Sequence, residues 1–133
     1  MAYKHSELYE CVAGGMGVYD LKILRDGTDG NVYTYNDDYE EMAEDFWGND
    51  EARHIDFSPV FNGNKMKSRI LMWHGLQDPI SPILHMEKMK EELDNNNIPY
   101  QAFTMSKLGH TFGQKEDIKA HLPVLKDFLF NEL

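Results

Sequence analysis

The hydrophobic and polar positions of this chain predict three strands that alternate with amphipathic helices. The clearest strand lies within residues 69–78, where the four apolar residues Ile-Leu-Met-Trp follow one another without interruption. Such a run is typical of a parallel strand that helices cover on both faces. Two further strands are predicted at residues 10–16, which end in glycines, and at residues 99–105, whose more alternating pattern indicates a position nearer the sheet edge.

Two long helices are predicted downstream of the central strand. The first begins near Ser81 and Pro82, a natural N-cap and first helical residue, and asparagines at 95–97 end it. The second carries an apolar stripe at helical spacing, and Pro123 is expected to start or kink it. The stripe comprises Ile118, Leu122, Val124, Leu125, Phe128 and Leu129.

The first half of the chain carries shorter helical signals. Residues 1–9 resemble the end of a helix, and residues 37–47 form an acidic amphipathic pattern that Gly48 would end. Asn49 or Asp50 can cap a further short turn before the central strand.

The order of strands and helices predicts an α/β fold, because helical crossovers join parallel strands. We expect a three-layer α/β/α arrangement around a short parallel sheet of about three strands. If the strands lie in sequence order, both crossover helices fall on one face and the last helix covers the other. No repeat or linker interrupts residues 1–133, which are predicted to form a single domain.

Composition narrows the class of protein. Hydrophobic residues make up 41% of the chain, enough for a packed core, and a net charge of −10 without a basic stripe argues against nucleic acid as a partner. Cys11 is the single cysteine, so no internal disulfide can form, and an inert core thiol is expected. No apolar run approaches the ~18 residues of a membrane span. We therefore expect a soluble chain, and the sequence does not indicate its cellular compartment.

Metal and cofactor binding find little support in the sequence. Residues 26–31 resemble part of a calcium loop, but the glycine is misplaced and the closing glutamate is absent. A metal site of His74, Asp78 and His110 is an alternative that lacks a tight ligand motif. We expect neither a metal ion nor a cofactor. The remaining histidines are predicted to be surface or helix residues: His5, His54, His85 and His121.

Two polar residues follow neighbouring predicted strands. Asp78 comes after the central strand and His110 follows the next strand, 32 residues later. Ligands of open α/β sheets bind beyond the carboxyl ends of the strands, so both side chains are expected at the same edge. An aspartate bonded to a histidine fixes the imidazole tautomer that a general base needs to activate a serine. His74 is expected to support the turn at the strand end.

The motif from His74 to Asp78, His-Gly-Leu-Gln-Asp, is followed by Leu-Gly-His-Thr-Phe from Leu108 to Phe112. Together these motifs resemble the paired segments that carry the catalytic aspartate and histidine in the prolyl oligopeptidase family of serine peptidases. The resemblance covers nearly the whole chain and implies the C-terminal part of the α/β-hydrolase fold. It also implies that Asp78 and His110 are catalytic, and that the serine nucleophile would lie just upstream of Met1.

The serine expected by this resemblance is missing from the printed sequence. None of its serines stands in a Gly-x-Ser-x-Gly setting, which holds the nucleophile on a strained strand-to-helix turn. We therefore predict a truncated portion of a serine hydrolase that carries acid and base and is inactive by itself. The alternative from another class is a non-catalytic interaction module with the same fold.

Substrate choice depends on the resemblance alone. Met16 and Tyr19 fall near the residues that form the proline pocket of dipeptidyl peptidase IV, a member of the family, and are candidate substrate-binding residues. Ser81 stands where relatives often carry valine, which leaves an acylaminoacyl peptidase or an esterase relative as alternatives. The substrate of the full-length protein is expected to be a peptide or an ester.

The strand at residues 10–16 is interior in the family fold. Without its upstream neighbour, one row of backbone groups on this strand would lack partners and could pair with another chain. We therefore expect a symmetric homodimer formed through this strand or through exposed helix faces.

Overall fold

A computed structural model describes residues 2–28, 41, 42, 44–46 and 48–131 of the chain. These residues contain a three-stranded parallel sheet with the spatial order β1-β2-β3. The strands are β1 (Cys11–Gly15), β2 (Arg69–Gly75) and β3 (Tyr100–Met105). Their spatial order equals their sequence order, so β2 is the central strand, as its unbroken apolar run predicts.

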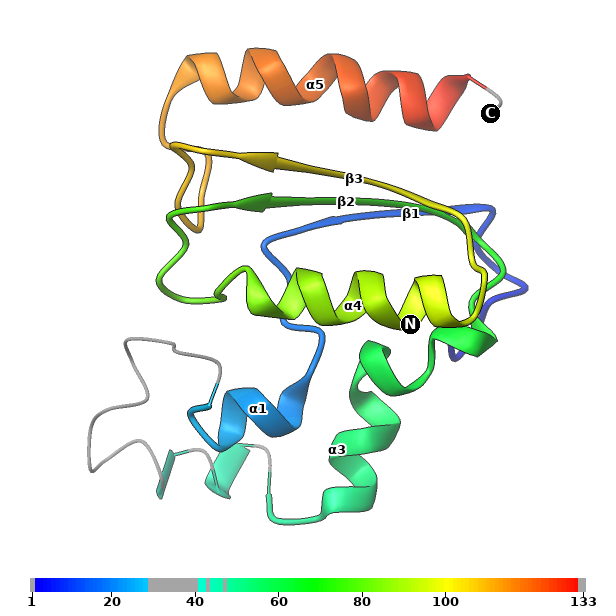
Figure 1. The fold of residues 1–133 in the computed structure, drawn as a ribbon, viewed down its shortest axis with the longest axis vertical. Coiled ribbons are helices and arrows are strands. Elements are labelled where there is room, and N and C mark those ends of the chain that lie inside the picture. The colour runs from blue at the N-terminus through cyan, green and yellow to red at the C-terminus, as the bar shows by residue number, and fades with distance from the viewer. Residues whose placement is uncertain (1, 29–40, 43, 47, 132–133) are drawn as a thin grey trace.

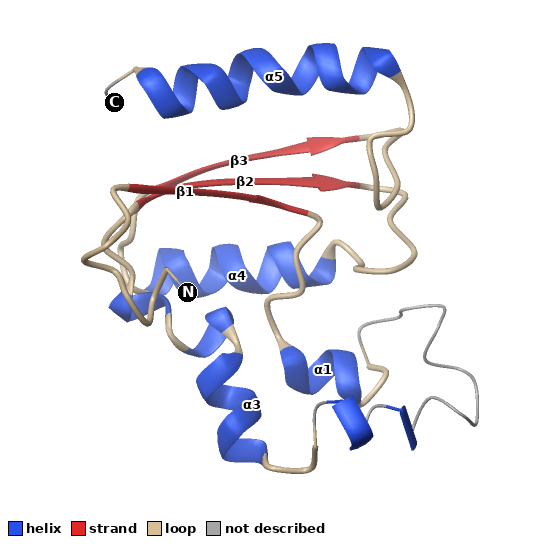
Figure 2. Ribbon diagram, turned by 180° about the vertical axis from the view of Figure 1, so that it is seen from behind, coloured by secondary structure: helices blue, strands red, loops and turns tan. Residues whose placement is uncertain are grey.

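Helices cover both faces of this sheet. Figure 1 shows α4 (Leu84–Asn95) on one face and α5 (Lys115–Phe130) on the other. The shorter helices α1 (Leu21–Arg25) and α3 (Glu51–Phe57) lie on the α4 side, which the reverse view of Figure 2 shows equally. The predicted three-layer α/β/α fold is confirmed.

Aspartate side chains cap the short helices that precede β2. The carboxylate of Asp20 accepts hydrogen bonds from the N–H groups of Lys22 and Ile23 and so caps α1. Asp50, one of the two predicted caps, accepts from the N–H of Arg53 at the start of α3. Two 3₁₀ turns, Pro59–Phe61 and Gly63–Lys65, then lead into β2.

The hydrophobic core lies between the sheet and α4. Each fully buried Met or Leu side chain there stabilises the fold by roughly 1.5–3 kcal/mol. The helical stripe that includes Met86, Met89 and Leu93 is thus a core stripe, as its spacing predicts. The buried members of the core are Tyr3, Val60, Met66, Ile70, Met72, Met86, Met89 and Leu93.

The face of α5 that packs on the sheet differs from the predicted stripe. His121 and Phe128 are its buried residues, whereas Ile118, Leu122 and Leu129 are 42%, 53% and 41% exposed. An aromatic cluster sets this rotation: the His121 ring lies 4.2 Å from Trp73, 5.9 Å from Phe103 and 4.9 Å from Phe112, measured between ring centroids. The helix also runs through Pro123, which neither starts nor interrupts it.

Several other predictions on helices need correction. Residues 2–9 form turns, not the end of a helix. Ser81 does not cap α4, which begins three residues later at Leu84. His54, His85 and His121 lie in helices, as the prediction of surface or helix residues allows, and all three are buried.

Two predicted segments fall partly outside the described residues. Of the acidic pattern at 37–47, residues 41, 42 and 44–46 are described and helical. Gly48 follows with a positive φ of 69°, as expected of a glycine that ends a helix. Residues 29–31 of the calcium-like loop are not described. Among the described helices, none has the length and apolar character needed to cross a bilayer.

The buried imidazole of His121 predicts how stability depends on pH. Burial lowers the pKa of His121 from its ordinary value of 6.5, so the unfolded chain binds its proton more readily than the folded chain. We expect the free energy of unfolding to fall as the pH drops below 6.5, because protonation then favours the unfolded state. His121→Phe keeps an aromatic ring and should reduce this loss, measured as urea midpoints at pH 7.5 and 5.5. Equal midpoint shifts in both proteins would contradict the prediction.

Candidate active site

The turns that follow β2 and β3 are hydrogen-bonded to each other. Gly75 pairs with Met105 at the ends of the two strands. Beyond them, the N–H of Leu76 donates to the carbonyl of Met105 at 3.0 Å, and the N–H of Gln77 donates to the carbonyl of Leu108 at 3.0 Å. These bonds hold the chain after β2 beside the chain after β3.

Asp78 and His110 meet at this edge. Nδ1 of His110 lies 2.9 Å from Oδ2 of Asp78. An ionised carboxylate can only accept, so Nδ1–H is the donor, and Nε2 of His110 is left unprotonated in the neutral ring. The Asp78 side chain is fully buried, whereas 34% of the His110 side chain is exposed. The arrangement places a buried acid behind an accessible base.

A tight turn fixes the second oxygen of Asp78. Oδ1 accepts hydrogen bonds from the N–H groups of Ile80 and Ser81, each at 2.9 Å. These bonds orient the carboxylate through the oxygen that His110 does not contact, and they also satisfy two N–H groups of the turn. His74 lies against this turn, in agreement with the supporting role expected for it, with Nε2 at 2.6 Å from the carbonyl oxygen of Ser81.

Gly75 allows the two turns to approach. A Cβ at this position would lie 2.3 Å from the carbonyl oxygen of Leu108 and 2.4 Å from that of Gly109. Both are backbone atoms, so no side-chain rotation could relieve the contact. Gly75 therefore controls the separation of Asp78 and His110, a role that the sequence analysis missed. The signal is a glycine at the end of the central strand, three residues before a polar side chain.

Met16, a candidate for substrate binding, lies directly after β1. Its N–H donates to the carbonyl of Trp73 at 3.0 Å, and its φ of 48° is in the left-handed region. This conformation costs a non-glycine residue about 1 kcal/mol or more, and such strain often occurs at functional sites. Met16 shares with Asp78 the carboxyl-terminal edge of the sheet.

Tyr19, the other candidate, packs against the core beneath β1. Its hydroxyl would lie 3.7 Å from a Cβ on Gly14, and burial raises its pKa to about 12. Tyr19 therefore stays uncharged over the physiological range. Substrate binding by Met16 and Tyr19 remains a prediction.

His74 and His110 both approach Asp78, but only His110 is hydrogen-bonded to its carboxylate. Nε2 of His74 lies 3.6 Å from the same carboxylate oxygen to which His110 donates. Throughout the described parts of the chain, no three His, Cys, Asp or Glu side chains are grouped so that they could hold a metal ion.

Solved structures of peptidases share this fold. The acylaminoacyl peptidase of Pyrococcus horikoshii matches with a TM-score of 0.75 at 15% identity, over 96% of this chain and 21% of that one. A Mycobacterium tuberculosis puromycin-hydrolyzing peptidase matches with a TM-score of 0.69 at 19% identity, over 84% and 16%. Porphyromonas gingivalis dipeptidyl peptidase 4 matches with a TM-score of 0.67 at 18% identity, over 93% and 16%. At these identities the likeness establishes the fold, and the chain spans only a small part of each relative.

Sequence comparison gives the family. No curated protein sequence matches the chain significantly. The family model for the prolyl oligopeptidase family, however, matches residues 1–133, the whole of the chain. The match includes both turns that carry Asp78 and His110. The chain therefore belongs to the prolyl oligopeptidase family.

Proposed function

We propose that this chain is the portion of a serine peptidase that carries the general base, His110, and the residue that orients it, Asp78. The observation that carries the proposal is the hydrogen bond from Nδ1–H of His110 to Asp78, which leaves Nε2 available in a partly exposed ring. Nε2 would accept the proton of a serine during attack on a peptide or ester carbonyl and then protonate the leaving group. Asp78 would stabilise the imidazolium formed in between.

The proposal needs a serine that residues 1–133 do not supply in a Gly-x-Ser-x-Gly motif. We propose that this serine, and the oxyanion donors that accompany it, belong to polypeptide outside these residues. The test is a longer form of the protein that includes an upstream Gly-x-Ser-x-Gly segment. It should label with a serine-directed fluorophosphonate, and His110→Ala should abolish the labelling, whereas exchange of the exposed His5 for alanine should not.

The rival functions are separated by the same longer protein. Failure to label, with an intact serine segment and a folded protein, would support a non-catalytic interaction module. Labelling combined with turnover of esters but not of peptides would support an esterase relative.

The chain of 133 residues alone should be inactive. Without the nucleophile, His110 has no hydroxyl to deprotonate, and the donors that stabilise the tetrahedral intermediate are incomplete. We expect no turnover of a proline anilide at any pH, measured by release of the chromophore. Turnover that disappears in His110→Ala would contradict this and indicate a nucleophile within the chain.

We also propose that the chain associates with a second copy through β1. Within the described sheet, β1 pairs with β2 on one side only, and Ala13 at its middle is exposed. A largely apolar cavity of about 180 Å³ lies behind it, lined in part by Val12, Tyr19 and Met72. An unpaired apolar edge is a template for another strand.

Light scattering should therefore detect a dimer at high micromolar concentration. Ala13→Lys puts a charge on the edge and should yield a monomer, because edge lysines disfavour strand pairing. The control Ala120→Lys changes an exposed position on α5 and should leave the dimer intact. A monomeric unmodified chain would contradict the proposal, and dissociation by Ala120→Lys alone would move the interface to α5.

A further inference from the structure

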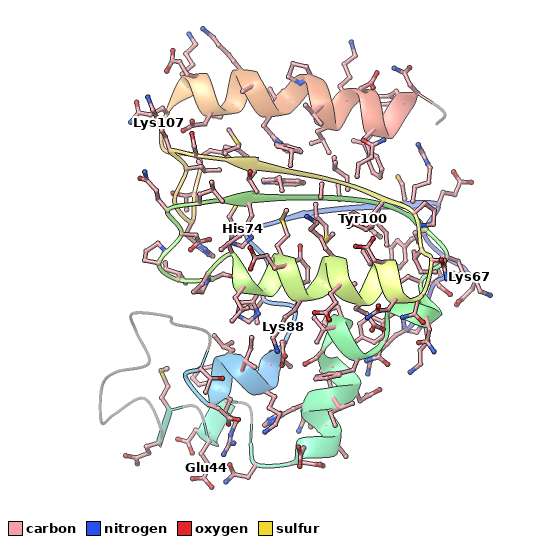
Figure 3. All side chains as sticks on the ribbon, in the orientation of Figure 1. Glu44, Lys67, His74, Lys88, Tyr100 and Lys107 are labelled. Carbon is pink, nitrogen blue, oxygen red and sulfur yellow. The ribbon has the colours of Figure 1, made fainter. Side chains whose placement is uncertain are left out.

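His74 is a buried polar residue that the reaction outlined above does not use directly. It occupies the next-to-last position of β2 and has no exposed surface. It shares a sheet face with Ile70 and Met72, the face that α4 covers, and Figure 3 shows it near the carboxyl end of β2. A histidine in an apolar core is costly unless its polar atoms bind partners.

The partner of His74 is a main-chain atom of the Asp78 turn. Nε2 lies 2.6 Å from the carbonyl oxygen of Ser81. A carbonyl can only accept, so Nε2–H donates. Nδ1 is buried and has no hydrogen-bond partner among the described residues. A proton on Nδ1 would be an N–H without an acceptor, so the contacts favour the Nε2–H tautomer.

Ser81 is fixed at three atoms. Its N–H donates to Oδ1 of Asp78, its carbonyl accepts from His74, and its hydroxyl donates to the carbonyl of Gly17 at 2.9 Å. The residue is completely buried. Through these bonds the turn that orients Asp78 is tied to β2 on one side and to the segment after β1 on the other.

The order of these bonds connects His74 to His110. His74 holds the carbonyl of Ser81, the peptide N–H of Ser81 holds Oδ1 of Asp78, and Oδ2 of Asp78 accepts from Nδ1–H of His110. Nε2 of His74 also lies 3.6 Å from Oδ2 of Asp78. Loss of this donor would free the turn to rotate and Asp78 with it.

We propose that His74 is a positioning residue that, through Ser81, holds Asp78 in the orientation that fixes the tautomer of His110. The inference rests on the proposed function, since tautomer control serves a general base. His74 does not touch the reacting atoms. Its role is to keep the acceptor of the His110 proton in place.

The test is a nitrogen-15 NMR measurement on the 133-residue chain, which needs no activity. Imidazole nitrogen shifts distinguish a protonated from a bare ring nitrogen. In the unmodified chain we expect His110 to be protonated at Nδ1 and His74 at Nε2. His74→Leu removes the donor and should shift His110 from the Nδ1–H form toward the Nε2–H form, as in the reference Asp78→Asn. His74→Gln keeps an N–H near the position of Nε2 and should retain the Nδ1–H form.

The outcomes separate this role from mere packing and from the peptidase proposal. If His110 keeps the Nδ1–H tautomer in a folded His74→Leu protein while Asp78→Asn loses it, the positioning role is wrong. If His74→Leu does not fold, the test is the tautomer of His74 in the unmodified chain. A His74 that is protonated at Nδ1 would overturn the inference. A longer protein that fails to label while His110 still depends on His74 would overturn the peptidase function alone.

Discussion

Asp78→Asn should lower the activity of a longer, serine-containing form of this protein by about 10⁴-fold. Oδ1 of the asparagine can still accept from the turn N–H groups that bind Oδ1 of Asp78. The amide nitrogen then faces His110 as a donor, so Nδ1 of His110 must accept and Nε2 must carry the proton. In that tautomer the ring cannot take a proton from serine. A 10⁴-fold loss corresponds to roughly 5.5 kcal/mol of transition-state stabilisation.

The measurement is the rate of fluorophosphonate labelling together with kcat on a peptide substrate. A matched control is Asp56→Asn, which removes a surface carboxylate that pairs with Lys4 and should leave both rates unchanged. Unfolding curves of the two variants verify that the fold persists. A loss smaller than about tenfold for Asp78→Asn would mean that His110 does not depend on this carboxylate.

In the described part of the site, Gly75→Ala should be the most disruptive substitution that adds a single methyl group. Its Cβ would lie 2.3 Å and 2.4 Å from two backbone oxygens, so the chain from Leu108 to His110 must move away from β2. We expect a loss of about 3 kcal/mol in the free energy of unfolding, near the upper end for overpacked sites. The movement should also lengthen the His110–Asp78 hydrogen bond.

Gly113→Ala provides the matched control for this substitution. Gly113 lies in the loop after β3 that carries His110, its φ is not in the left-handed region, and no atom would approach an added Cβ within 4 Å. Urea unfolding of both variants measures the stability, and the nitrogen-15 signal of His110 reports the hydrogen bond. If the two substitutions lower the free energy of unfolding by the same small amount, the close approach at Gly75 does not control the site.

The sequence was sufficient to predict the three layers and the central strand, because both depend on short-range patterns. The apolar run in β2 and the methionine spacing of α4 each indicate burial without reference to other segments. The face of α5 could not be predicted in this way. Apolar residues extend around much of that helix, and the choice among them is made by Trp73, Phe103 and Phe112, which belong to other elements and surround His121.

The site, too, could be predicted from the sequence only in part. That Asp78 and His110 lie at one edge follows from the rule for strand ends, and the structure brings them to 2.9 Å. The role of Ser81 could not be predicted from that rule, because a serine before a proline is typical of a helix cap. In the folded chain its N–H binds Asp78 and its hydroxyl binds Gly17, 64 residues away in sequence. Such partners can be found only once the segments are assembled.

The interlocked turns after β2 and β3 also bear on the order of folding. The bonds from Leu76 to Met105 and from Gln77 to Leu108 can form only when β3 docks on β2, after a loop of about 30 residues has closed. Acid and base therefore come together in the same step as this strand pair, and a partly folded chain in which β3 is not docked lacks the contact between His110 and Asp78. Protection of the Leu76 and Gln77 amides from hydrogen exchange would thus report when the site forms during folding.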